Sequence, residues 1–175
     1  MRCLLLGVTL LLGNYSRGHG AGIGFPLGGD GGQEVWEATV EAVGGRPFDP
    51  MLDLIAAGAN VNWQNVAMKN FTALHYSAMR GHRRVTYQLI RAGADPHAVS
   101  IHGNTPLHLA AMHGYEDIVR ELIGAGAEAD RQNNQGKTPL DKAYEFEHDY
   151  RPKHAGVRHS SEILKVRFLL SLLDL

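Results

Sequence analysis

The sequence has little cysteine and almost no net charge. Its 175 residues include one cysteine, Cys3, which excludes an intramolecular disulfide and any zinc site built on a cluster of cysteine ligands. Lysine and arginine number 17 against 18 aspartate and glutamate residues, so no broad basic surface argues for nucleic acid. Hydrophobic residues make up 44% of the chain, which is enough for a packed core. Composition therefore favours one folded domain or one compact array.

Long apolar runs are also scarce near the N-terminus. The run from Cys3 to Leu12 is too short to span a bilayer. It follows one positive charge, Arg2, and precedes a polar stretch with small residues, which is the outline of a secretory signal peptide. Residues 1–20 are interpreted as either a signal peptide or a disordered leader. Residues 21–32 are rich in glycine without completing the G-x-G-x-x-G spacing of a phosphate-binding loop, so they are expected to form a linker.

What the chain does contain is an internal repeat. The four-residue segments that start at Thr72, Thr105 and Thr138 read TALH, TPLH and TPLD, and they begin 33 residues apart, twice over. Residues 72–96 also align without gaps on residues 105–129. Two equal steps and so long an alignment identify a repeat protein.

The residue pattern of 105–127 shows the structure expected for one repeat. Thr105 is a good N-cap, and Pro106 suits the first helical position, where its missing N–H is not needed. Apolar residues follow at i, i+3 and i+4 from Leu107, which gives a short first helix one apolar face. A second apolar stripe begins at Ile118, and Gly126 stands where a left-handed C-cap is expected. Such a hairpin has too little core to stand alone and must stack on its neighbours.

These features resemble the ankyrin-repeat family. Its 33-residue period and its Thr-Pro-Leu-His-x-Ala motif are met by Thr105, Pro106, Leu107, His108 and Ala110. The resemblance covers about residues 33–175 and implies an all-α solenoid of helix-turn-helix units joined by β-hairpin-like loops. The repeats are expected at about 33–62, 63–95, 96–128 and 129–175, with an insertion near 147–158.

The chain departs from the family pattern in several places. The first repeat lacks the Thr-Pro-Leu-His start, as terminal repeats often do. The loop from Asn60 to Thr72 is two residues longer than its counterpart from Asp95 to Thr105. The last repeat has Asp141 in place of the motif histidine. Its final apolar segment either packs as the C-terminal cap or docks on something else.

The resemblance gives the motif residues structural roles. The motif histidine of this family lies at the start of the first helix, where it hydrogen-bonds to a threonine hydroxyl and to backbone groups. No acid–histidine–nucleophile pattern recurs, and the Gly-Lys-Thr at 136–138 lacks the first glycine of a P-loop. We therefore predict no catalytic residue, no cofactor and no enzyme activity. The residues expected to have structural roles are Thr72, His75, Thr105, Pro106, His108, Thr138 and Pro139.

Two further patterns give only weak evidence for a metal site and a glycosylation site. His148, His154 and His159 gather in the insertion with Asp149, but their spacing matches no common zinc site, so no metal is predicted. The sequon at Asn70 is a glycosylation site only if the chain enters the secretory pathway.

The remaining candidate functional residues lie on the surface of the predicted stack. Ankyrin stacks bind partner proteins through loop tips and the exposed side of each first helix. Apolar side chains at those positions favour a protein partner over nucleic acid. No small-molecule substrate and no membrane span are predicted. Carried over by repeat position, the expected contact residues are Met68, Lys69, Phe71, Met79, Arg80, Ile101, His102, Asn104, Met112, His113, Asn134, Gln135 and Lys137.

The leading hypothesis is a non-enzymatic interaction module, or scaffold, of about four repeats that binds another protein. Two alternatives stay open: a secreted effector, or a metal-responsive protein that uses the histidine-rich residues 148–159. An intracellular location, cytoplasmic or nuclear, is favoured by the resemblance, whereas the apolar leader leaves the secretory pathway open.

Overall fold

A computed structural model describes residues 30–47, 49–150, 165–166 and 169 of the chain. Its contacts divide the chain into two units, Met1–Asp30 and Gly31–Leu175. All the described helices belong to the second unit. The leader and most of the linker and of the insertion lie outside the described residues.

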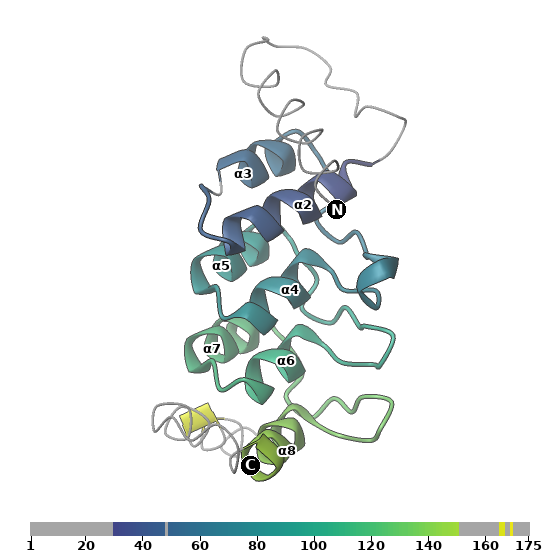
Figure 1. The fold of residues 1–175 in the computed structure, drawn as a ribbon, viewed down its shortest axis with the longest axis vertical. Helices are drawn as coiled ribbons and strands as arrows, with labels where there is room; N and C mark the ends of the chain where they lie inside the picture. The colour runs from purple at the N-terminus through teal and green to yellow at the C-terminus, as the bar shows by residue number, and fades with distance from the viewer. Residues whose placement is uncertain (1–29, 48, 151–164, 167–168, 170–175) are drawn as a thin grey trace. The chain divides into compact units, whose positions relative to one another are not determined.

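Helices form nearly all the regular structure of the described residues (Figure 1). One isolated antiparallel bridge joins Asn65 to Phe71, and no described segment forms a strand. The expected all-helical repeat architecture is confirmed. The helices are α2 Gly32–Val43, α3 Asp49–Ala56, α4 Ala73–Arg80, α5 Arg83–Arg91, α6 Pro106–Met112, α7 Glu116–Gly124 and α8 Pro139–Tyr150, with a 3-10 turn, η2, at Val66–Met68.

The helices stack as pairs in chain order. In each pair α2/α3, α4/α5 and α6/α7 the two helices pack together, and α4 contacts α2, α6 contacts α4 and α8 contacts α6 (Figure 1). Fully buried alanines such as Ala78, Ala110 and Ala143 allow this close approach of the first helices. The long loops that join successive pairs project on one side of the stack (Figure 1).

The core is a column of large apolar side chains between the helices. Leu74 and Leu107 from the first helices, and Leu89 and Leu122 from the second helices, are completely buried. Burying such a side chain contributes about 2 kcal/mol to folding. Because each repeat supplies only a few of them, the stack is stable only as a whole.

The C-terminal segment is described at three residues alone. Val166 is completely buried, and the ammonium of Lys165 lies 4.0 Å from the Glu116 carboxylate of α7. The Lys165 ammonium thus lies at ion-pair distance from α7, and its side chain is mostly exposed. The rest of that segment lies outside the described residues.

Candidate functional site

The motif threonines and histidines cap the first helices of the two central repeats. At α4, the Thr72 hydroxyl accepts from the His75 backbone N–H, and the Thr72 backbone N–H donates to Nδ1 of His75 over 3.2 Å. At α6, Thr105 and His108 form the same reciprocal pair. The hydroxyls also lie 2.9 and 2.8 Å from the two Nδ1 atoms. Each Nδ1 is therefore an acceptor, which assigns the proton of the neutral ring to Nε2.

That proton joins each histidine to the loop of the following repeat. Nε2 of His75 lies 3.0 Å from the Asn104 carbonyl, and Nε2 of His108 lies 3.0 Å from the Lys137 carbonyl. Burial lowers the pKa of His75 to about 4, and burial also lowers the pKa of His108. Both rings are buried, neutral and fully hydrogen-bonded, so they are not arranged as exposed general bases.

Asp141 takes the histidine's capping role in the last repeat. Its Oδ2 accepts from both the backbone N–H and the hydroxyl of Thr138 over 2.9 Å, and the Thr138 hydroxyl accepts from the Asp141 N–H over 3.2 Å. The hydrogen bond from the Thr138 backbone is the main reason that the pKa of Asp141 is lowered. A carboxylate caps the helix but cannot donate to a further loop.

The loops between repeats close as hairpins and are joined to one another at their tips. Ile101 N–H donates to the Lys69 carbonyl over 2.9 Å, and Asn134 N–H donates to the His102 carbonyl over 3.1 Å. The Asn134 side-chain amide also donates to the Ile101 carbonyl over 3.0 Å. These bonds make the tips one continuous row. The backbone pairs that close the hairpins are Asn65–Phe71, Ser100–Asn104 and Asn133–Lys137.

The two extra residues of the first loop change its tip. They accompany the turn η2, which is capped by the Asn65 side chain accepting from the Met68 N–H over 3.1 Å. Lys69 and Asn70 follow with φ of 61° and 58°, a left-handed conformation that side chains other than glycine seldom adopt. The longer loop thereby displays Val66 and Met68 at its end.

Large apolar side chains are exposed along this row of tips. Val66 is 80% exposed, Met68 40% and Ile101 58%. Single exposed apolar residues are ordinary, but three on adjacent, hydrogen-bonded tips form a patch. We call these three residues the tip patch.

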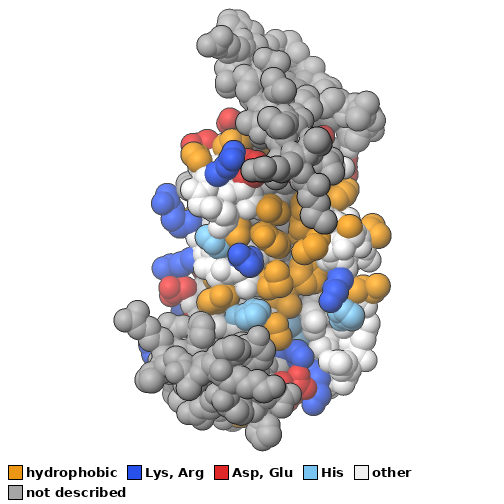
Figure 2. Space-filling model, in the orientation of Figure 1, with side chains coloured by type: hydrophobic (Ala, Val, Ile, Leu, Met, Phe, Trp, Pro, Cys, Tyr) orange, Lys and Arg blue, Asp and Glu red, His pale blue; other side chains and the backbone are white. Residues whose placement is uncertain are grey.

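A second apolar group lies on the first helices beside the loops. Figure 2 shows a band of hydrophobic side chains along this face of the stack. Trp36 and Tyr76 meet within it with ring centroids 5.4 Å apart. Its buried members are Trp36, Phe71 and Leu109, and its partly buried members are Val40, Trp63, Tyr76, Met79 and Met112. We call this group the inner surface.

A comparison with known families assigns this architecture. The model described as ankyrin repeats in three copies matches residues 42–133 and again residues 74–150. The chain belongs to the ankyrin-repeat family. No curated protein matches the chain significantly. Ankyrin repeats are generally protein–protein interaction modules, and the family is typically non-enzymatic.

The structure corrects the expectation that Phe71 is an exposed contact residue of this ankyrin stack. Its side chain is only 8% exposed, and its ring stacks on that of His75 with centroids 5.3 Å apart. The reason is local: Phe71 pairs with Asn65 at the base of the hairpin and precedes the N-cap Thr72. Phe71 therefore holds loop and helix together beneath the surface.

Asn104, another of the expected contact residues, forms hydrogen bonds within the stack. Its carbonyl faces Nε2 of His75, and its side-chain oxygen accepts from the Asn133 amide over 2.7 Å. The other expected contact residues divide by exposure. Exposed are Met68, Lys69, Arg80, Ile101, His102, Asn134 and Gln135; partly buried are Met79, Met112, His113 and Lys137.

Sequence reasoning missed Tyr76, Leu109 and Val66. Tyr76 and Leu109 each stand four residues after a capping threonine, at the same repeat position. A residue at that spacing lies on the same face as Met79 or Met112, so helical periodicity was the available signal. Val66 had no such signal, because it belongs to the extra residues of the longer loop.

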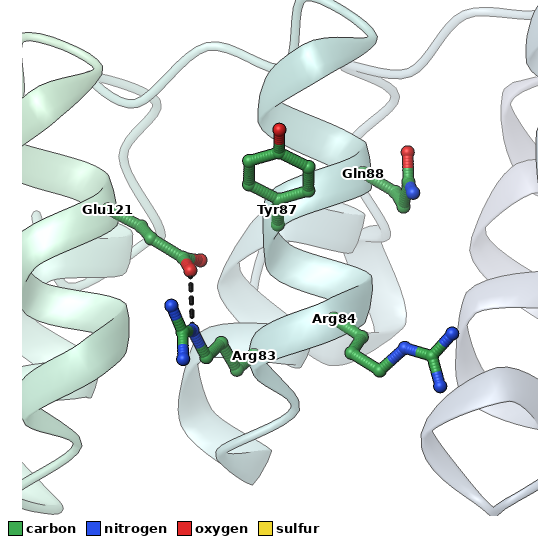
Figure 3. A pocket seen from close by; sticks show the side chains of 5 residues that line it. All are labelled: Arg83, Arg84, Tyr87, Gln88 and Glu121. Carbon is green, nitrogen blue, oxygen red and sulfur yellow. Dashed lines mark hydrogen bonds and ion pairs between the residues drawn. The ribbon is translucent and has the colours of Figure 1, made fainter.

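A pocket of about 320 Å³ lies on the second helices, α5 and α7 (Figure 3). Its strongest charges are already paired: Nε of Arg83 donates to Glu121 over 2.7 Å, and Asp117 lies 3.5 Å from the same guanidinium. These carboxylates raise the pKa of Arg83. The remaining lining residues are Arg84, Tyr87 and Gln88.

The described part of the chain lacks two other kinds of site. It contains no group of three or more histidine, cysteine or acidic residues that could hold a metal ion. None of its helices is long and apolar enough to cross a membrane. The side chains of His148, His154 and His159 lie outside the described residues, so the metal-responsive alternative concerns a part of the chain that the structure does not describe.

Proposed function

We propose that this ankyrin stack is a non-enzymatic module that binds another protein through the inner surface and the tip patch. The observation that carries the proposal is the exposure of Val66, Met68 and Ile101 on adjacent loop tips. Exposed apolar patches of this kind mark interaction sites on soluble proteins.

The chemistry of the inner surface supports a protein partner. Tyr76, Trp63 and the methionines Met79 and Met112 offer large side chains that keep part of their surface accessible. Aromatic residues concentrate binding energy at interfaces, and methionine adapts its shape to different partners. A few such anchors would account for most of the affinity.

The rigidity of the stack supports the same reading. Each histidine joins one helix to the next loop, and the tips of successive loops are hydrogen-bonded through Lys69, His102 and Asn134. A preformed surface loses little conformational entropy on binding. Docking onto this face would therefore need no rearrangement of the loops.

Replacement of the two central tip residues tests the proposal. Proteins captured by the full chain are identified by mass spectrometry, and binding of a purified partner is then measured by calorimetry. Met68→Ser with Ile101→Ser should weaken that binding at least about tenfold, because the tip patch loses its apolar contacts.

The matched control is Tyr87→Ser, which removes a 46% exposed aromatic ring from α5. Its affinity and melting temperature should equal those of the wild type. Unchanged affinity of the Met68→Ser, Ile101→Ser variant would refute the proposed surface.

A further inference from the structure

We infer that the segment docking on this surface is acidic: a stretch of another protein with apolar anchors flanked by aspartate or glutamate. The inference rests on the proposed function and adds the charge of the partner. It follows from two basic side chains that stand beside the apolar residues of α4 and of the first loop tip.

These two side chains are Lys69 and Arg80. Lys69 is exposed and directly follows Met68 at the first loop tip. Arg80 is exposed and stands four residues after Tyr76, which places the two on the same face of α4. The central part of the surface thus has a cation at the loop side and another at the helix side.

The inner surface continues into a lysine pair at α8. Glu145 occupies the repeat position of Met79 and Met112, since the three are 33 residues apart. Its carboxylate lies 2.7 Å from the Lys142 ammonium and 3.3 Å from the Lys137 ammonium. Asp141 of the same helix also has a lowered pKa, in part because of Lys137, so the two ammonium groups at this end are balanced by two carboxylates. Figure 2 shows basic side chains bordering the hydrophobic band.

Acidic residues of the first helix interact with other groups and do not pair with Lys69 or Arg80. Glu41 of α2 lies 3.9 Å from Arg46, and Glu37 accepts from the Gln33 amide over 3.0 Å. They belong to the N-terminal helix, whereas the cations come from the later repeats. The partner's carboxylates are therefore expected near Lys69 and Arg80, over the first loop tip and α4.

The same charges argue against other occupants. Residues 1–29 of this chain contain Arg2 and Arg17 but no aspartate or glutamate, so that segment does not complement a basic surface. A second copy docking face to face would bring like charges together. Nucleic acid would match the cations but would leave Met68 and Ile101 without apolar contacts.

The experiment uses a displayed library of random dodecapeptides selected on the full chain at physiological salt, where distant charges are screened. Peptides that bind the wild type but not the Met68→Ser, Ile101→Ser variant should be rich in both apolar and acidic residues. Lys69→Glu with Arg80→Glu should weaken the best of them at least about tenfold. The matched control, Arg84→Glu with Arg91→Glu, makes the same charge change on α5 and should bind normally.

The outcomes separate this inference from the proposed function. Tip-dependent peptides that are neutral or basic, or that ignore the reversal at Lys69 and Arg80, would overturn the acidic partner and leave the proposed surface standing. A selection without tip-dependent peptides would overturn both. Displacement of the peptides by mixed-sequence single-stranded DNA would overturn the inference in favour of a nucleic-acid ligand.

Discussion

Lowering the pH from about 7 to about 5 is expected to destabilise the fold through its buried motif histidines. Burial lowers the pKa of His75 from 6.5 to about 4, and the pKa of His108 is lowered for the same reason. The unfolded chain binds protons at these rings near pH 6.5, whereas the folded His75 stays neutral until about pH 4. The stabilisation that the neutral His75 ring contributes is therefore complete above about pH 6.5, and it is lost as the pH falls toward 4.

The expected loss between about pH 7 and pH 5 is about 2 kcal/mol for His75 alone, and His108 adds to it in the same direction. The structural cause is that a protonated Nδ1 of His75 would face the N–H and the hydroxyl of Thr72 and could no longer accept from them. Such a loss is a large share of the stability of an ordinary domain. Urea unfolding followed by circular dichroism at both pH values measures it.

A double variant assigns the effect. His75→Gln with His108→Gln should lower stability at neutral pH but flatten its pH dependence. The carboxyls of Asp141 and Glu145 have lowered pKa values, from ordinary values of 3.8 and 4.5, so their stabilisation is lost only at lower pH. Equal free energies of unfolding of the wild type at both pH values would refute the reasoning.

Two packing predictions follow from the same structure. Phe71→Ala should lower the free energy of urea unfolding by about 3 kcal/mol, because the ring is buried, while Val66→Ala should change it by less than about 0.5 kcal/mol; equal losses would contradict the burial of Phe71. Gly81→Ala should lower the melting temperature more than Gly93→Ala: both glycines have positive φ, but the new Cβ at 81 would lie 2.6 Å from the Tyr115 ring and the one at 93 has nothing within 4 Å. Equal shifts would show that the ring moves aside freely.

The 33-residue repeat made the helices predictable, since Thr105 and Pro106 define a helix start and Leu107 begins an apolar stripe. The extra length of the first loop was also visible in the spacing. Its effect was not, because the turn η2 and the left-handed Lys69 depend on how the tip closes against Ile101. A count of residues fixes the length of a loop but not which side chains it displays.

Which loop side chains are buried was harder to predict from the sequence. Phe71 occupies a position that varies between repeats, so pattern alone placed it with the contact residues. The Asn65–Phe71 bridge and the stacking on His75 place it in the core instead. The side chain before a capping threonine is thus decided by the hairpin, whose closure a single sequence does not reveal.

In the last repeat, the residue at the position of the motif histidine has a different role. His75 and His108 each cap a helix and donate to a following loop, whereas Asp141 caps a helix and donates to none. The position four residues after the capping threonine changes in parallel: the partly buried Tyr76 and the buried Leu109 give way to Lys142, one turn before Glu145. At this position the stack is therefore apolar in α4 and α6 and charged in α8. A ligand that lay along all three helices would therefore meet apolar side chains at this position of α4 and α6 and side chains of both charges at α8.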